Sequence, residues 1–181
     1  MPNITATRTP VLTIMTLICL LLGGCSQVGK EFSSYDRFTH SGFEGVRVKD
    51  MGLPGVYAPF TAQLDLIRFR DPGKKSRFVF RTRIATTDDN IWADKIVWIA
   101  DGHRIEMSGT SKLSDVRVSR YGTVYYESAL FVATPSQLNK LADSQTISFR
   151  IYGARGKGPG CDLQQESLQA IRMFCNRHLF N

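Results

Sequence analysis

From about residue 61 onward, apolar and polar side chains alternate with a period of two, and this alternation limits most strongly how the chain can fold. Successive side chains of an extended strand point to opposite faces, so the alternation predicts strands with one buried and one exposed face. The first two predicted strands are Ala62–Arg70 and Arg77–Ala85. The segment Asp71–Ser76 between them carries Pro72 and Gly73, which favour a turn.

The same pattern continues through two more predicted hairpins and a single strand. Asp-Gly is a favoured two-residue hairpin turn, and Tyr-Gly provides a similar break between two alternating segments. The predicted elements are Lys95–Ala100 and His103–Met107 around Asp101-Gly102, Asp115–Arg120 and Thr123–Val132 around Tyr121-Gly122, and the strand Thr146–Tyr152.

Two segments have helical features instead. Thr134-Pro135 is typical of a helix start, and Leu138 and Leu141 would form the buried side of a short helix. A second helix is expected from about Asp162 or Ser167 to Arg177, with its apolar stripe formed by Leu168, Ile171, Phe174 and Cys175. The predicted fold is therefore mainly β, an antiparallel sheet or β-sandwich with one short helix and a C-terminal helix. Helices do not alternate with the strands, which argues against a parallel doubly wound fold.

The N-terminus carries a secretory pattern. Arg8 precedes an apolar run, Val11–Leu22, that is too short to span a bilayer, and Leu22-Gly23-Gly24-Cys25 follows. This tetrapeptide resembles the lipobox of bacterial lipoproteins. The resemblance covers residues 1–25 and implies cleavage before Cys25, with a diacylglyceryl group on its sulfur and an acyl chain such as palmitate on its amine. In Gram-negative lipoproteins a residue such as Ser26 favours the outer membrane, so the resemblance implies a lipid-anchored envelope protein there, on the periplasmic face.

The lipobox also divides the chain. We expect residues 1–24 to be a cleaved signal peptide, residues 25–41 a flexible lipidated tether, and residues 42–181 a single β-rich domain. The precursor has 23 basic and 16 acidic side chains, and removal of Arg8 leaves a net charge of 22 minus 16, or +6. This charge favours anionic partners such as lipid head groups, acidic polysaccharide or an acidic envelope protein. Nucleic acid is not expected as a partner in the envelope.

Two cysteines remain after cleavage and lipidation, Cys161 and Cys175. An even number of cysteines in an oxidising compartment makes them a candidate disulfide. The bridge has a geometric condition, because an unbroken helix from Asp162 to Cys175 would place the two cysteines roughly 20 Å apart. A disulfide needs Cα atoms within about 7 Å, so the segment after Cys161 would have to fold back before the helix begins.

A run of basic residues is the candidate binding surface. If Arg70 pairs with Arg77 in the first hairpin, the arginines of both strands fall on one face, and a register slip of one residue would separate them. Arginine binds phosphate and carboxylate groups bidentately, so such a face could bind an anionic partner. The alternative is a solvated face whose charges are neutralised by neighbouring acids. The candidate residues are Arg68, Arg70, Lys74, Lys75, Arg77, Arg81 and Arg83.

The sequence contains no convincing catalytic or metal-binding motif, and no cofactor is expected. His103 with Asp101 and Glu106 would be the best acid–base group, although a solvated histidine beside a turn is the simpler interpretation. The first functional hypothesis is a non-enzymatic accessory or binding protein that contacts an envelope protein or an anionic component. A small-molecule or glycan-binding module, using Trp92, Trp98 and the tyrosines, and an unrecognised periplasmic hydrolase are the alternatives.

Overall fold

The computed structural model describes residues 28–36, 39–50, 60–87, 91–119 and 122–179. Within these residues the chain is mainly β, as predicted, with nine strands and two helices. The strands are β1 (Glu31–Asp36), β2 (Ser41–Asp50), β3 (Phe60–Arg70), β4 (Arg77–Thr86), β5 (Ala93–Ala100), β6 (His103–Ser119), β7 (Gly122–Ala133), β8 (Ile147–Gly153) and β9 (Gly156–Asp162), and the helices are α2 (Pro135–Asp143) and α3 (Gln165–His178).

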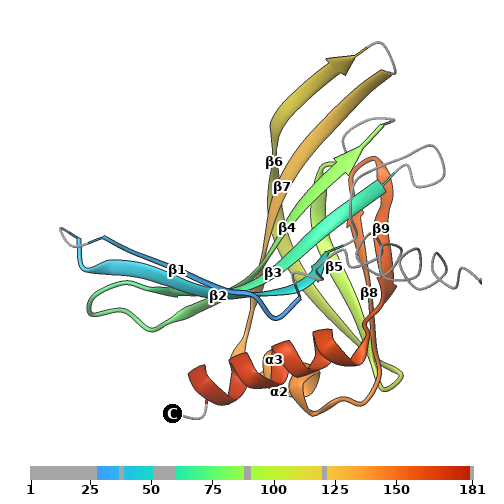
Figure 1. The fold of residues 1–181 in the computed structure, drawn as a ribbon. Coiled ribbons are helices and arrows are strands. Elements are labelled where there is room, and N and C mark those ends of the chain that lie inside the picture. Colours follow the sequence, from blue (N-terminus) through green and yellow to red (C-terminus); the bar gives the residue numbers. More distant parts are fainter. Residues whose placement is uncertain (1–27, 37–38, 51–59, 88–90, 120–121, 180–181) are drawn as a thin grey trace, which may run out of the picture.

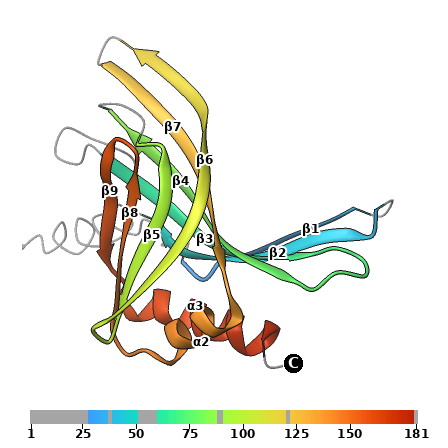
Figure 2. The same cartoon turned by 180° about the vertical axis from the view of Figure 1, so that it is seen from behind.

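The strands form one antiparallel sheet in the order β1-β2-β3-β4-β7-β6-β5-β8-β9, so the single sheet, not the sandwich, is the architecture observed. The sheet bends strongly enough that β3 and β9 contact each other. Both helices lie against one face of it (Figure 1), which we call the helix face. Seen from behind, β5, β8 and β9 lie side by side above the helices (Figure 2). The opposite face is called the open face.

Local turn and cap chemistry explains several of these elements. Asp101 and Gly102 have φ values of 47° and 82°, so the Asp-Gly turn joins β5 to β6 as predicted. Thr134 caps α2 through a reciprocal bond, in which its hydroxyl accepts from the Gln137 amide and the Gln137 side chain accepts from the Thr134 amide. Pro135 then occupies the first turn of α2.

The core fills the space between the helix face and the two helices. Trp98 on β5 lies between Phe80 and Phe149, with ring centroids 4.6 Å and 5.3 Å away. The helices add Leu138 and Leu141 from α2 and the predicted stripe of Leu168, Ile171, Phe174 and Cys175 from α3. Burial of this apolar surface is the main force that holds the curved sheet on its helices.

A buried carboxylate fixes the start of β5. Glu127 on β7 accepts hydrogen bonds from the backbone amides of Ile91, Trp92 and Ala93. These bonds hold Trp92 at a φ of 53°, a conformation that tryptophan rarely adopts. Glu127 thus attaches the chain that enters β5 to the neighbouring part of the sheet.

One edge of β6 is only partly covered. β5 pairs with β6 as far as Lys95 and Ser108, whereas β7 pairs with β6 up to Ser119. Beyond Ser108, no strand among the described residues pairs with the outer edge of β6. The β6–β7 hairpin therefore extends above the rest of the sheet as a two-stranded arm, seen at the top of Figure 1.

The predicted tether is too long. Residues 31–36, which fall within the predicted tether, form β1 and pair with β2 at the start of the predicted domain. The Gly29 amide also donates to the Arg47 carbonyl at 2.8 Å, so the sheet begins close to the first described residue. Polar composition suggested a tether, but pairing with β3 stabilises these strands where local sequence does not.

The predicted disulfide is wrong as well, because Cys161 and Cys175 are both free thiols. α3 begins at Gln165, three residues after the end of β9, and continues unbroken past Cys175. Ten helical residues cover about 15 Å, so the helix carries Cys175 away from β9. The fold-back that a bridge would require does not occur.

Candidate binding groove on the open face

The register of the first hairpin divides the predicted arginine face. Arg77 pairs with Phe69 and Arg68 pairs with Phe78, so the hairpin is shifted by one residue from the pairing of Arg70 with Arg77. Arg68 and Arg70 consequently lie on the helix face, whereas Arg77, Arg81 and Arg83 lie on the open face. The shift has a packing cause, since it places Ala62, Leu64 and Leu66 of β3 in the core.

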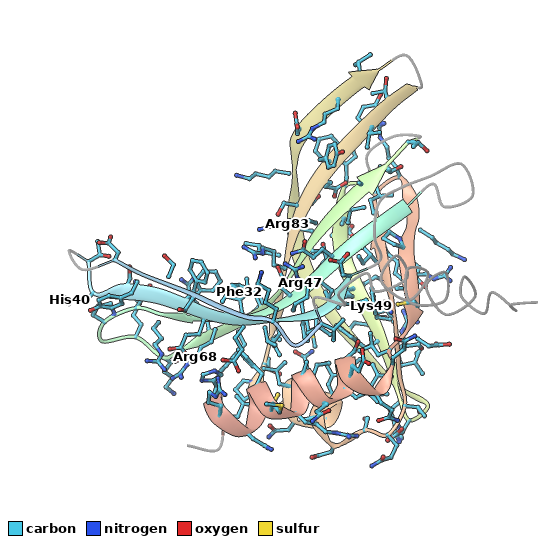
Figure 3. The ribbon with its side chains drawn as sticks, viewed as in Figure 1. Phe32, His40, Arg47, Lys49, Arg68 and Arg83 are labelled. Carbon is cyan, nitrogen blue, oxygen red and sulfur yellow. The ribbon has the colours of Figure 1, made fainter. Side chains whose placement is uncertain are left out.

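The two arginines of the helix face are occupied by contacts with α3 and β2. Arg68 lies 3.2 Å from His178 through its Nη1 atom and donates through Nε to the Ser76 hydroxyl at 3.0 Å. Arg70 forms a 3.1 Å ion pair with Glu44. These residues join the sheet to the end of α3, and Figure 3 shows Arg68 on the side of the sheet that faces this helix.

The remaining predicted cations differ in their surroundings. Arg77 forms a 3.0 Å ion pair with Asp71 and lies over the Phe69 ring, 5.9 Å from its centroid. Lys74 and Lys75 are exposed in the turn between β3 and β4. Only Arg81 and Arg83 lie near the middle of the open face, where other strands contribute further charges.

Arg81 belongs to a buried ionic cluster that the sequence alone did not reveal. Asp65, whose side chain is 0% exposed, forms ion pairs with Arg47 and Arg81, the latter at 2.8 Å. The Gln63 amide donates to the same carboxylate at 3.1 Å. One carboxylate thus serves two arginines, and Arg47 also pairs with Asp50 at 3.4 Å, so two acids balance the two arginines of this cluster.

Arg83 and Lys112 add positive charge beside this cluster. Ser128 on β7 pairs with Arg83 on one side and with Lys112 on the other, so the two cations flank it. Neither cation forms an ion pair within the part of the chain that the structure describes. The Arg83 side chain is exposed, but the sheet still shields part of it from water. This partial desolvation lowers the pKa of its guanidinium, and repulsion from Arg81 lowers the pKa further. A bound anion would relieve that repulsion.

An apolar groove of about 420 Å³ lies on this face; Lys112 lines it, and Arg83 pairs with another lining residue, Ser128. Its apolar lining comes from Phe43, Ile67, Phe69 and Leu130, and its polar lining includes Arg81, Lys112 and Ser128. Leu130 is 40% exposed, although its neighbours on the helix face, Ala129 and Phe131, are fully buried. The site therefore combines an apolar lining with a cationic rim.

The bend of the sheet creates this arrangement. β1, β2 and the β3–β4 hairpin extend to the left of Figure 1, and the β6–β7 arm rises from them, so the open face forms an inner corner. Figure 3 shows Phe32, Arg47 and Arg83 in this corner. The guanidinium carbon of Arg81 lies over the Phe32 ring, 5.4 Å from its centroid. This cation–π contact joins the cations to the aromatic side chains of β1 and β2.

The other candidate groups are not assembled into sites. Asp101 accepts hydrogen bonds from the Gln145 and Thr146 amides, which lower the pKa of its carboxyl, and Glu106 is paired with Arg104. Each acid is therefore engaged by other groups, Asp101 by backbone amides and Glu106 by Arg104. Trp98 lies in the core and Trp92 is partly exposed at the start of β5, so the proposed aromatic pocket is not formed.

Of this site the sequence indicated Arg81 and Arg83. It did not indicate Arg47, Asp65, Lys112 or the apolar lining, because these residues meet only when β2, β6 and β7 take their places beside the first hairpin. The sequence feature that could have indicated the groove is the presence of apolar residues, such as Ile67 and Leu130, on the face that also carries the charged residues.

No helix within the described residues is long and apolar enough to cross a membrane. Comparison of the chain with protein-family models, curated proteins and solved structures found no match.

Proposed function

We propose that this chain is a lipid-anchored protein of the bacterial envelope that binds an anionic envelope component in the open-face groove, without catalysing a reaction. Its anchor would be Cys25, and its place the periplasmic face of the outer membrane. The basis for the anchor is the lipobox-like segment Leu22-Gly23-Gly24-Cys25. The basis for the binding role is Lys112, which lines the apolar groove, together with Arg83 across Ser128, since neither cation forms an ion pair with other described residues.

The proposal rests mainly on Arg83 and Lys112, because neither forms an ion pair with other described residues. Exposed arginines and lysines of a sheet are commonly neutralised by cross-strand acids, as Arg70 is by Glu44. Arg83 and Lys112 instead flank an uncharged serine and form no ion pair with other described residues. The acids of the neighbouring cluster are already engaged, because Asp65 is shared by Arg47 and Arg81 and Asp50 pairs with Arg47. A phosphate or carboxylate group at this position would gain charge-assisted hydrogen bonds.

A crosslink from Ser128 tests the proposal. Ser128 would be replaced with a photoreactive amino acid in the full lipidated protein, and adducts formed in living cells would be identified. The matched variants are Arg83→Ser with Lys112→Ser, and Lys74→Ser with Lys75→Ser, since each pair removes two positive charges. We expect an adduct to an anionic component that the first pair abolishes and the second retains. Adducts that are indifferent to Arg83 and Lys112 would sink the proposal.

The anchor has its own test. Cells grown with labelled palmitate should incorporate the label into the wild-type protein and not into a Cys25→Ser variant. A Ser26→Ala variant is the control for substitution beside the cleavage site and should keep the label. An unlabelled wild-type protein would contradict lipidation while leaving the binding groove to be tested on its own.

A further inference from the structure

The proposed lipidation site lies only a few residues along the chain before the start of the described sheet. Cys25 lies three residues before Val28, the first described residue. Three residues extend over about 10 Å at most, so the anchor is confined to the neighbourhood of Val28. A lipid on Cys25 would therefore hold this part of the sheet against the bilayer.

The segment that follows Val28 runs beside the cationic cluster. The Gly29 amide donates to the Arg47 carbonyl, and the Lys30 carbonyl accepts from the Arg47 amide at 3.0 Å. Arg47 is the first member of the open-face cluster and is joined through Asp65 to Arg81. Two strand spacings, or about 10 Å, separate β2 from β4, which carries Arg81 and Arg83. The cationic rim thus begins beside the anchored end of the domain.

From these observations, and resting on the proposed function, we infer that the groove holds an anionic phospholipid taken from the bilayer that carries the protein's own anchor. Its phosphate would lie between Arg83 and Lys112, and one acyl chain would lie along Phe43, Ile67, Phe69 and Leu130. The charge of the rim complements a phosphate, and the apolar lining complements a hydrocarbon chain. A soluble polysaccharide or an acidic peptide would match the rim but leave the apolar lining in contact with water.

The test uses the lipidated protein in vesicles. Proteoliposomes would contain phosphatidylglycerol, or phosphatidylcholine as the zwitterionic comparison without net charge, with a trace of the same lipid that carries a photoreactive group near the end of one acyl chain. After illumination, labelled peptides would be identified by mass spectrometry. A second arm would place the photoreactive lipid only in separate vesicles without protein.

We expect label on the peptides that contain Ile67–Phe69 and Leu130, at least fivefold more with phosphatidylglycerol than with phosphatidylcholine. The label should fall to the phosphatidylcholine level in Arg83→Ser with Lys112→Ser, and should persist in Lys74→Ser with Lys75→Ser. Replacement of the exposed Leu130 by Arg should block the groove and remove the label, without loss of the far-ultraviolet circular dichroism of the sheet.

Other outcomes separate the two proposals. Equal labelling by both lipids would overturn recognition of an anionic head group. Label that appears only when the photoreactive lipid is in separate vesicles would overturn the source in the protein's own bilayer. No label in the groove, together with a charge-dependent adduct from Ser128 in cells, would overturn the phospholipid and keep the proposed function with a different anion. Failure of both experiments would remove both proposals.

Discussion

Asp65 is the residue on which the open face depends most. Its buried carboxylate is the shared partner of Arg47 and Arg81, so its removal takes from Arg81 its ion-pair partner among the described residues and leaves Arg47 with the longer pair to Asp50 at 3.4 Å. Loss of one partner from a buried ionic group typically costs about 3–5 kcal/mol. We expect Asp65→Ala to lower the free energy of unfolding by about that amount, as measured by urea denaturation.

Asp115→Ala is the matched control for this prediction. Asp115 also pairs with an arginine, Arg117 at 2.9 Å, but both side chains are at least half exposed. Solvent screens such a pair, so its removal should leave the urea midpoint almost unchanged. If the two alanine variants were equally stable, the buried cluster would contribute nothing beyond an ordinary surface pair.

His178 should make stability depend on pH. Its side chain is 5% exposed, and desolvation lowers the pKa of its imidazole, with Arg68, Arg177 and Arg70 acting in the same direction and Glu44 against them. The unfolded chain therefore takes up a proton at a higher pH than the folded protein. Stability is complete above the unfolded value of about 6.5 and falls as the pH drops toward the lower folded value.

Replacement of this histidine should remove that dependence. We expect His178→Gln to flatten the decline of the urea midpoint between about pH 7 and 5, whereas His103→Gln, at an exposed position, should keep the wild-type slope. A full slope in His178→Gln would assign the pH dependence to other groups.

At the scale of elements, α3 determines the chemistry of the cysteines. Burial on the helix stripe raises the pKa of Cys175 to about 12, and partial burial also raises the pKa of Cys161. Since the thiolate is the reactive form, a thiol reagent at about pH 8 should label Cys161 slowly and leave Cys175 unlabelled in the folded protein. In denaturant both should react, which mass spectrometry of a protein that lacks residues 1–25 would show.

This labelling also checks the correction to the predicted disulfide. A protein that showed no reactive thiol in denaturant until a reductant was added would contain the bridge after all. A Cys175→Ala variant should show one reactive thiol in denaturant under either condition.

Elements defined by a local signal could be predicted from the sequence. The Asp101-Gly102 turn, the Thr134 cap and the apolar stripe of α3 each depend on residues a few positions apart, and the structure confirms all three. β9 could not be predicted in this way, because Gly156–Asp162 has the composition of a loop. Its Gly160 lies so close to the Phe149 carbonyl that a side chain would not fit, and this requirement appears only when β8 is beside it.

In the candidate site, too, local sequence features could be predicted and features that depend on strand pairing could not. Arg81 and Arg83 were identified because they alternate along one strand, but the face they share with Arg68 and Arg70 was predicted wrongly. A connection as long as Asp71–Ser76 does not fix the register, and packing of Leu64 and Leu66, instead of Ile67 and Phe69, into the main hydrophobic core decided it. Lys112 and Leu130 entered the site through pairing of β7 with β4, which no local pattern specifies.

For the whole molecule, the short distance between the anchor and the sheet should control access to the bilayer. Insertion of 15 glycine and serine residues between Gln27 and Val28 would add a flexible spacer with a mean reach of about 20 Å. The local concentration of bilayer lipid at the groove should then fall, and the photolabelling yield with it, by several-fold. The thermal midpoint should not change, which is the control that the domain remains folded.

Unchanged labelling after this insertion would contradict the idea that the groove receives its lipid because the anchor holds it close to the bilayer. A rigid spacer of equal length, rich in proline, gives a second comparison, since it should hold the domain further from the bilayer and reduce labelling more strongly than the flexible one.

The uncovered edge of β6 has a consequence for behaviour in concentrated solution. An exposed row of backbone donors and acceptors is a template onto which another chain can add, and it makes self-association a hazard. Lys112, Asp115 and Arg117 place charges along this stretch, and the irregularity between Leu113 and Asp115 interrupts its pairing surface. These features act as gatekeepers against edge-to-edge growth of fibrils or dimers. Lys112, which lines the groove, would then also keep neighbouring molecules apart when many are anchored close together. Its replacement would cause the protein to self-associate on the membrane.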